Sequence, residues 1–440
     1  MLSRPRGYEY HVITLESMSI HYLKIAARKA RTVSVEFVTF ARREVRTLLV
    51  GLLFTFLSSF GQTFFISLFV PYFQDVFALT DASYGTMYSV ATLGSAITLP
   101  YLGGWIDRTS LRRYGLAVAG GLTVACLSVA LSYHVGFLLL SLYLLRLTGQ
   151  GLSSHTGRTA MARAYSGGRG RALSIANLGY PLGEGILPLM FTALLWYVSW
   201  RTAWLGVSGV LLLVFIPLLA FLIADIKPEE QFVNEDNDRD PDSPGDDEMP
   251  DSTTYLELLS EVRFWMLTPA VILPGFWATG LLLYQVQMAE QFQWSKALMA
   301  TAFVSFAVGR VIFSLMAGPL IDLLSARRLF PLYLLPFGAG LLAAYFHPGK
   351  WSAFLYLGCL GMTLGAGGNL KSSLFAELYG TKILGTVRSL FTSISVAGTA
   401  LCPSLMGWLL YGGFSFTTIL AWALGSVVVA SSLAFYQLYD

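Results

Sequence analysis

The sequence has few charged residues and few cysteines. Only 12% of its 440 residues are Asp, Glu, Lys or Arg, about half the share that is usual in a soluble domain. Its three cysteines, Cys126, Cys359 and Cys402, lie within apolar runs without a CxxC spacing, so we interpret them as small core residues that define no redox compartment. The net charge of +3 is too small to indicate a nucleic-acid partner.

Motifs for ATP-driven or covalent chemistry are also absent from the sequence. It contains no GxxxxGK[ST] phosphate-binding loop, which argues against a primary pump. The five histidines are scattered without a metal-ligand pair, and no nucleophile triad is visible. An intramembrane enzyme would need such a cluster. We therefore expect no enzymatic activity, no cofactor and no metal site.

Long apolar runs fill most of the chain instead. Hydrophobic residues make up 55% of it, and runs of about 20 residues, the length that spans a bilayer as a helix, recur along nearly its whole length. This pattern predicts an all-α integral membrane protein with twelve transmembrane helices. The expected spans are 48–72, 83–106, 114–133, 136–158, 171–196, 202–224, 264–288, 297–321, 329–347, 351–371, 384–410 and 414–437.

Two related stretches, 215 residues apart, divide the chain into two halves. They are Gly103–Arg113 and Gly318–Arg328; in each, Gly precedes Asp by four residues and two arginines follow the Asp at five and six. A repeat of this size predicts two pseudo-symmetric six-helix bundles. We expect the bundles to occupy residues 47–224 and 264–440, joined by a linker over 225–263.

The N-terminal segment and the linker are polar. Residues 1–46 hold nine Lys or Arg against four Glu, and the apolar spacing from about Met18 indicates a basic amphipathic helix on the cytoplasmic membrane face. A disordered tail, or extra sequence before a true start at Met18, is an equal alternative. The linker has eleven acids and one base between Glu229 and Asp251, which predicts a disordered tether, with a regulatory or docking role as the minor alternative.

Basic residues set the expected orientation. If both termini are cytoplasmic, eleven basic residues fall in inner loops or at adjoining helix ends and three in outer loops, as the positive-inside rule requires. The chain is then expected in the inner or plasma membrane, with the linker and both repeated stretches inside. The inner residues are Arg108, Arg112, Arg113, Arg158, Arg163, Arg169, Arg171, Arg327, Arg328, Lys382 and Arg388; the outer ones are Arg201, Lys296 and Lys350.

The first repeated stretch resembles the loop motif between helices 2 and 3 of the major facilitator superfamily of secondary transporters. Ser110 stands where the family usually has Gly, and the second copy has Leu323 where the first has Arg108. The run Leu145–Gly151 is similar to a second family motif, built on an intramembrane Arg and close-packing glycines. The resemblance implies alternating access with a cytoplasmic gate made by Gly103, Asp107, Arg108, Arg112, Arg113, Asp322, Arg327 and Arg328.

Within the superfamily, the run Arg169–Leu173 and Arg310 in the middle of helix 8 look like the monocarboxylate-porter branch. The resemblance implies a small organic anion, such as a carboxylate, as substrate. Phe306 replaces the acid that the branch has one turn before this Arg, and helix 11 has no Lys in its core, so substrate and coupling ion stay open. The alternative is a proton-coupled drug or metabolite efflux antiporter. A transport-inactive sensor would need a folded signalling domain, for which the linker is too short and acidic.

Charges inside the membrane are costly and usually functional. Arg310 can hold a carboxylate bidentately, or it can lock two helices together. An apolar setting favours a neutral carboxyl group, so Glu184 is either a proton carrier or a fixed structural acid. The family fold brings helices 5 and 8 together between the halves. It therefore implies a switching Glu184–Arg310 pair, with Arg146 as a rival partner.

The remaining candidates are polar or aromatic residues within the spans. Lys371, near the inner end of helix 10, can bind substrate or extend its long stem to the cytoplasm. Each of the others is more often a helix-contact residue than a ligand. We expect a monomer that binds a small-molecule substrate, protons and the lipid bilayer. The further candidates for a substrate cavity are Gln62, Tyr88, Trp277, Tyr284, Gln285 and Asn369.

Overall fold

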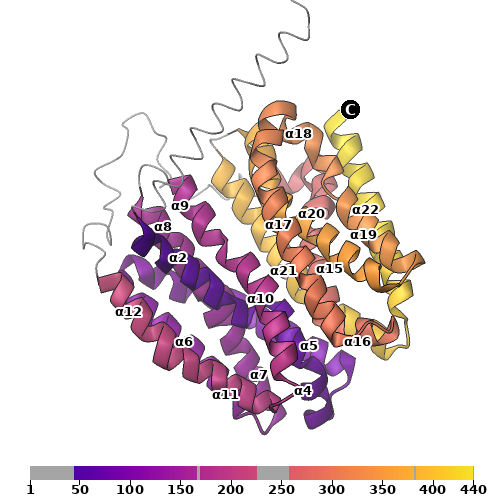
Figure 1. Cartoon of the computed structure of the whole chain (residues 1–440). Helices are drawn as coiled ribbons and strands as arrows, with labels where there is room; N and C mark the ends of the chain where they lie inside the picture. The colour runs from indigo at the N-terminus through magenta and orange to yellow at the C-terminus, as the bar shows by residue number, and fades with distance from the viewer. Residues whose placement is uncertain (1–43, 166–168, 225–256, 381–382, 440) are drawn as a thin grey trace, which may run out of the picture.

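A computed structural model describes residues 44–165, 169–224, 257–380 and 383–439. Within these ranges all regular secondary structure is helical, as the sequence predicts, and the helices form two bundles that stand side by side (Figure 1). The predicted amphipathic helix near the N-terminus and most of the acidic linker lie outside the described residues.

The first bundle, here called the N half, runs from indigo to pink in Figure 1. Its helices begin and end within a few residues of the six predicted spans. They are α2 (Val45–Leu57), α3 (Thr63–Ile66) and α4 (Val70–Phe77); α5 (Asp81–Gly103); α6 (Leu111–Ala130); α7 (Val135–Leu144) and α8 (Ser154–Ala164); α9 (Arg169–Asn177) and α10 (Gly179–Leu194); and α11 (Trp200–Val210) and α12 (Ile216–Ala224).

The second bundle, the C half, runs from pale red to yellow in the same view. It repeats the order of the first with fewer breaks. Its helices are α15 (Val262–Leu283) and α16 (Gln285–Gln291); α17 (Lys296–Leu324); α18 (Ala326–Leu329) and α19 (Leu335–Phe346); α20 (Lys350–Tyr379); α21 (Leu384–Tyr411); and α22 (Phe416–Tyr439).

Most of the predicted spans are long and apolar enough to cross a membrane. In the described ranges nine helices meet this condition, and the pair Val45–Gly61 and Thr63–Phe77, bent by 45°, raises the number to ten. The other two predicted spans are α5 and the pair α9–α10. Helix α5 is rich in Ser, Thr and Gly, many of them buried in the bundle, and α9 is interrupted at Leu178 before α10 begins. Polar residues make α5 less apolar, and the break leaves α10 with 16 residues, fewer than the about 20 that span a bilayer.

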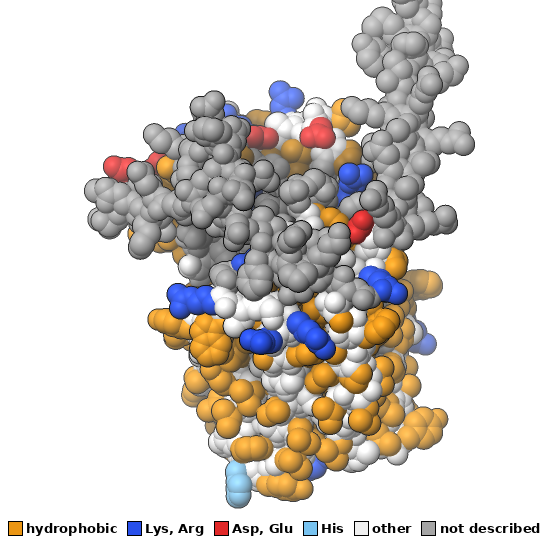
Figure 2. Space-filling view, turned by 90° about the vertical axis from the view of Figure 1, so that its left-hand side faces the viewer, with side chains coloured by type: hydrophobic (Ala, Val, Ile, Leu, Met, Phe, Trp, Pro, Cys, Tyr) orange, Lys and Arg blue, Asp and Glu red, His pale blue; other side chains and the backbone are white. Residues whose placement is uncertain are grey.

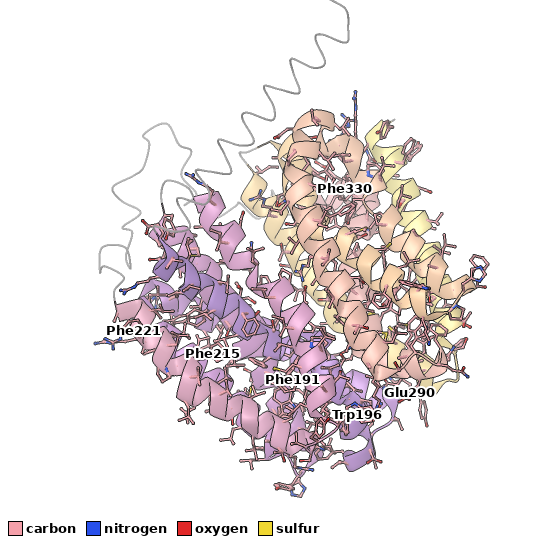
Figure 3. The ribbon with its side chains drawn as sticks, viewed as in Figure 1. Phe191, Trp196, Phe215, Phe221, Glu290 and Phe330 are labelled. Atoms are coloured by element: carbon pink, nitrogen blue, oxygen red, sulfur yellow. The ribbon has the colours of Figure 1, made fainter. Side chains whose placement is uncertain are left out.

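The outer surface of the bundles is apolar, as contact with lipid requires. Phe221 at the edge of the N half is 61% exposed, whereas Phe191 is 3% exposed and packs edge-on against Phe65 inside the half (Figure 3). Figure 2 shows a broad hydrophobic face, with Lys and Arg side chains gathered toward one end. We call the end that carries the two repeated stretches, at the top of Figure 1, the motif end, and the opposite one the far end.

Candidate functional site

The two halves are joined by hydrogen bonds near the far end. The Tyr284 hydroxyl donates to the Asp81 carbonyl (2.8 Å), and the Gln285 amide donates to Ser67 Oγ (2.6 Å) and to the Phe64 carbonyl (3.3 Å). We call these contacts the far-end seal. Tyr284 and Gln285 were expected to line a substrate cavity; in the structure both hold the halves together, and Gln285 also lies on the wall of a cavity near this end. Further bonds of the seal join Gln287 to Gln74 (3.0 Å) and Ser404 to Ser89 (3.0 Å).

Toward the motif end a cavity of about 380 Å³ lies between the halves. Residues on α8, α9 and α10 form its N-half wall, and residues on α17 and α20 form its C-half wall. The wall includes Arg158 and Tyr180 on one side and Arg310, Ser314 and Asn369 on the other. Polar groups of both halves therefore converge on one space, which is the usual character of a small-molecule site.

An ion pair between Arg310 and Glu184 joins the halves at the edge of this cavity. Arg310 Nη1 donates to Glu184 Oε1 across the boundary between α17 and α10. The Arg310 side chain is 30% exposed and that of Glu184 only 6%. The arginine also lies over the Tyr180 ring, with Cζ 5.6 Å from its centroid. Of the two partners considered from the sequence, the structure places Arg310, and not Arg146, on Glu184.

Local sequence explains why these side chains meet. Tyr180 precedes Glu184 by one helical turn, so both project from the same face of α10 toward α17. Gly365 lets α20 approach the Arg310 backbone, since a Cβ at this position would lie 2.3 Å from the Arg310 carbonyl oxygen. Asn369, one turn further along α20, donates to the Ser314 carbonyl (3.0 Å). The three helices thus hold Arg310 beside the cavity.

Arg146 is buried inside the N half and is absent from the wall of the cavity. It lies in a π-helical segment, Leu145–Ser153, and its Nη1 donates to the Gly61 carbonyl (3.2 Å) and to Thr63 Oγ1 (3.4 Å). Its Cζ is 5.1 Å from the centroid of the Tyr88 ring. The Gly61 carbonyl borders the bend between α2 and α3, where the helical hydrogen-bond ladder is interrupted. The hydrogen bonds of Arg146 therefore go to the broken first span, and its place in a substrate site stays a prediction.

Lys371 does not extend to the cytoplasm, which was one of the two roles considered from the sequence. Its Nζ donates to the Val271 carbonyl of α15 (3.3 Å), in the turn before Pro274. Proline offers no N–H to the carbonyl four residues earlier, that of Ala270. The hydroxyl of Tyr333 donates to this Ala270 carbonyl instead. Tyr333 thus satisfies the carbonyl that Pro274 leaves free, and Lys371 supplies a further donor to the next carbonyl.

Three other candidates serve packing inside one half. Trp277 Nε1 donates to Ser426 Oγ (2.9 Å), which joins α15 to α22 in the C half. Tyr88 is fully buried, and its hydroxyl donates to Thr63 Oγ1 (2.9 Å). Gln62 is half-buried at the bend of the first span. The helix-contact interpretation therefore fits these positions better than a place on the cavity wall.

The two repeated stretches lie at the motif end, and most of their charged side chains are exposed. Arg163 Nη1 donates to the Ile106 carbonyl (3.0 Å) in the first stretch, next to Asp107, whose side chain lies outside what the structure describes. In the second stretch the Glu377 carboxylate accepts from the backbone N–H groups of Ala326 (2.8 Å) and Arg327 (3.0 Å). The exposed residues are Arg108, Arg112, Arg113, Asp322, Arg327 and Arg328, whereas Gly103 is buried.

Several functional candidates were missed from the sequence. Tyr180 was detectable, because it lies one turn before an intramembrane acid on the same helix face. Glu377 and Tyr333 carried no signal, since their roles depend on backbone groups of other helices. Within the described ranges no group of three or more His, Cys, Asp or Glu residues could hold a metal ion.

Comparison with known proteins agrees with this architecture. The family model described as Major Facilitator Superfamily matches residues 51–286 and 271–439. A bacterial homologue of the human lysosomal transporter Spinster, in an inward-facing and unoccupied conformation, superposes with a TM-score of 0.67 at 16% identity, covering 89% of this chain and 96% of the other. A nucleoside transporter, NupG, superposes with a TM-score of 0.66 at 12% identity, covering 90% and 99%.

No curated protein matches the chain by sequence. The structural likenesses, at these low identities, establish the fold, and the family model covers most of the chain. Neither distinguishes among branches, so the resemblance to monocarboxylate porters stays a prediction. The repeated stretches, the two helical bundles and the family match agree, and the chain belongs to the major facilitator superfamily of membrane transporters.

Proposed function

We propose that this protein is a secondary transporter of a small organic anion, such as a carboxylate, and that protons drive or accompany the movement. Secondary transport in general follows from the family; the anion and the proton are the proposal. The observation that carries it is the Arg310–Glu184 pair, because it joins the two halves beside the motif-end cavity. A pair in this position can respond both to substrate and to a proton.

The motif end is proposed to face the cytoplasm. Basic residues concentrate there, as the positive-inside rule requires, and both termini and the linker would then be inside. The far end is sealed by Tyr284 and Gln285, and the cavity lies toward the motif end. In the proposed orientation this arrangement would be an inward-facing state. With the three native cysteines replaced by alanine, labelling of a single linker cysteine, Ser243→Cys, should occur only from the cytoplasmic side. Modification only from outside would reverse the proposed topology.

In the proposed mechanism the substrate carboxylate and Glu184 compete for Arg310. While Glu184 is ionised, it occupies the guanidinium and ties α10 to α17. A proton on Glu184 removes that charge and leaves Arg310 as a cation without a counter-ion, which favours binding of an anion. Tyr180 stays under the guanidinium and limits its movement. The proton would therefore bind Glu184 first, and the substrate would then bind Arg310.

Substitutions at Arg310 and Glu184 test this mechanism. Arg310→Lys keeps the charge but loses the planar fork, and Arg310→Ala loses both. A charge-assisted bond contributes about 1.5–3 kcal/mol, so Arg310→Ala should lower substrate affinity by about 10- to 150-fold, with Lys in between. Glu184→Gln resembles the protonated acid and should bind the anion with little dependence on pH. The assay is substrate affinity in detergent beside the unfolding temperature of each variant.

The substrate for this assay comes from a thermal-stabilisation screen across carboxylates, sugars and cationic drugs, since binding raises apparent stability by mass action. Arg146→Lys is the matched control, because Arg146 is a buried arginine that is absent from the cavity wall. It should lower the unfolding temperature while folded protein keeps its affinity. Normal affinity in a stable Arg310→Ala protein would remove Arg310 from the site. Stabilisation by cationic drugs alone would favour the efflux antiporter.

A further inference from the structure

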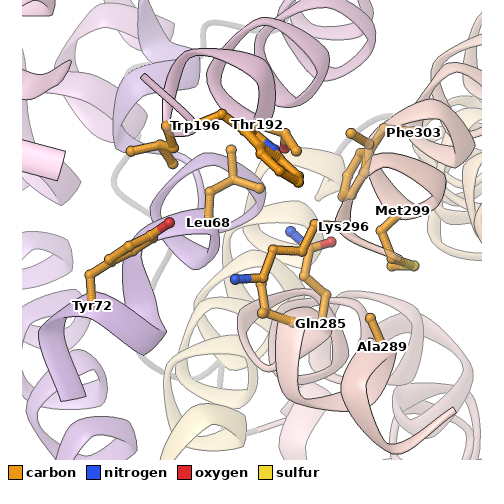
Figure 4. A pocket seen from close by; sticks show the side chains of 12 residues that line it. Leu68, Tyr72, Thr192, Trp196, Gln285, Ala289, Lys296, Met299 and Phe303 are labelled. Atoms are coloured by element: carbon orange, nitrogen blue, oxygen red, sulfur yellow. The ribbon is translucent and has the colours of Figure 1, made fainter. Parts of the chain in front are cut away.

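A second cavity, of about 260 Å³, lies between the halves near the far end. It is walled by α4, the turn before it and the end of α10 on one side, and by α16 and the start of α17 on the other (Figure 4). Trp196, at its rim, lies at the far end beside the boundary between the bundles (Figure 3). Most of the wall is apolar, including Leu68, Met299 and Phe303. This cavity is separate from the motif-end cavity, with which it shares no lining residue.

A buried acceptor without a partner belongs to this wall. Gln285 is 2% exposed, and its Nε2 donates to the Phe64 carbonyl and to Ser67 Oγ. A carbonyl oxygen can only accept, so this contact fixes the orientation of the amide. Oε1 must then point away from Phe64, and it has no hydrogen-bond partner among the described residues; neighbouring atoms cover it, so a donor reaches it only after a small shift of the side chains around it. A buried polar atom left in this way requires an explanation, because its desolvation is not compensated.

A cation lies at another edge of the same cavity. Lys296 is the first residue of α17, its side chain is exposed, and its Nζ is 5.9 Å from the centroid of the Tyr72 ring. No carboxylate in the described part of the chain pairs with it. Lys296 lies in the C half and Tyr72 in the N half, so the ammonium reaches across the boundary (Figure 4). Its charge is available to an anion at the cavity mouth.

We propose that the far-end cavity binds a small aromatic carboxylate that carries a hydrogen-bond donor at its opposite end. The carboxylate would lie on Lys296 and the aromatic body against Leu68, Met299 and Phe303. The donor would bind Gln285 Oε1 after the side chains that cover this atom shift. The volume exceeds the ~150 Å³ of an apolar cavity that holds benzene. It is far too small for a two-chain phospholipid. Charge, apolar wall and buried acceptor thus specify the three parts of the ligand.

Binding there has a conformational consequence. The wall is built from both halves, and it exists while the far-end seal holds them together. A ligand that binds one state better than the other shifts the equilibrium toward that state. The occupant therefore stabilises the inward-facing state, and it slows transport without competing for the Arg310 site. This site depends on the alternating states of the fold and not on which solute is carried.

Two fluorescent probes and two lysine variants test the proposal. The probes are 6-hydroxy-2-naphthoate and 2-naphthoate, which differ only in the hydroxyl donor. Purified full-length protein should bind the hydroxynaphthoate saturably, and binding of the naphthoate should be about tenfold weaker, because Gln285 Oε1 would stay unpaired. Lys296→Gln should weaken the hydroxynaphthoate by about tenfold. Lys350→Gln is the matched control, since Lys350 is also an exposed first residue of a far-end helix but is absent from this cavity, and it should leave binding unchanged.

A cavity-filling variant adds an independent arm. Ala300 is 3% exposed on the cavity wall, so Ala300→Leu should exclude the probe; Ala289→Leu on α16 fills the same space from the other helix. The filling variant to use is the one that unfolds at a normal temperature. If it and Lys296→Gln both bind the hydroxynaphthoate as tightly as wild type does, the proposed site is wrong. Equal affinity for the two probes would overturn the assignment of Gln285 Oε1 as a contact. Loss of binding in Arg310→Ala, with Lys296→Gln unaffected, would place the probe in the motif-end cavity instead and overturn the proposal.

Discussion

The two repeated stretches share their residue spacing but are fastened in different ways. In the first, Ser110 has an ordinary φ of −61°, and its hydroxyl caps the helix α6 by accepting from the Arg113 N–H (3.4 Å). In the second, Ser325 has φ 69° and ψ 151° and makes no side-chain cap. Glu377 of α20 supplies the missing acceptors for α18. One helix start is thus capped locally and the other by a different helix.

The anchoring residues differ in charge as well. Arg163 on α8 and Glu377 on α20 are 214 residues apart, almost the 215 that separates the stretches, so they occupy corresponding places in the two halves. Arg163 donates to a carbonyl of its stretch, whereas Glu377 accepts from amides. The repeat therefore preserves the positions of the loops and the fact that a neighbouring helix holds them. The anchoring side chain can be a donor in one half and an acceptor in the other, because a loop backbone offers both N–H and carbonyl groups.

The largest expected difference between the stretches concerns transport rate. Asp107 is followed by Arg108, but Asp322 is followed by Leu323, and Asp322 is exposed. We expect Asp107→Asn to slow transport by about tenfold, a barrier change of about 1.4 kcal/mol, while substrate affinity stays nearly constant. Asp322→Asn should have a much smaller effect. The measurement is initial uptake into vesicles, normalised to inserted protein. Equal rates for Asp107→Asn and wild type would remove the first stretch from the gate.

A smaller effect is expected for stability at Glu377. Glu377→Ala leaves two amides of the second stretch without their carboxylate, and loss of a helix cap costs about 0.5–2 kcal/mol. The unfolding temperature should fall accordingly, and Glu377→Gln, which keeps one acceptor oxygen, should fall less. Ser110→Ala removes the local cap of the first stretch and provides the counterpart. If Glu377→Ala unfolds at the wild-type temperature, the capping role is wrong.

The smallest effect concerns the backbone of the second stretch. The conformation of Ser325 belongs to a region that is almost restricted to glycine, where other residues carry about 1–3 kcal/mol of strain. A glycine at this position would relieve that strain, but the greater entropy of glycine in the unfolded chain would cancel about 0.5–1 kcal/mol of the gain in stability. Ser325→Gly should therefore stabilise the protein slightly, whereas Ser110→Gly should be neutral or slightly destabilising. Melting temperatures of the two variants that move in the same direction would contradict this contrast.

Helix positions were largely predictable because hydropathy reports directly on lipid contact. The structure has helices at every predicted span, with ends shifted by a few residues. The bend near Gln62 and the π-helical segment that carries Arg146 were not predicted. Both depend on a carbonyl and a guanidinium from segments 85 residues apart in sequence. No local pattern encodes such a pairing.

The residues of the candidate site also fall into two groups, those that the sequence could predict and those that it could not. Arg310 and Glu184 were predictable, since isolated charges in apolar segments stand out, and the family resemblance placed their helices side by side. The roles of Trp277, Tyr284 and Gln285 were harder to predict. An aromatic or amide residue in a span has the same sequence pattern whether it binds a ligand or another helix. Burial and hydrogen-bond partners decide between these roles, and both are properties of the folded chain.

Pro274 leaves one carbonyl of α15, that of Ala270, without its helical donor. This carbonyl accepts from the hydroxyl of Tyr333, which precedes α19, and the next carbonyl, that of Val271, accepts from Lys371 on α20. Withdrawal of the Tyr333 hydroxyl would leave the buried Ala270 carbonyl unpaired, at a cost of about 1–3 kcal/mol. The middle of α15 is therefore tied to the segment before α19 and, through Lys371, to α20. Because α20 also carries Asn369 on the cavity wall, one helix contacts both that wall and the middle of α15.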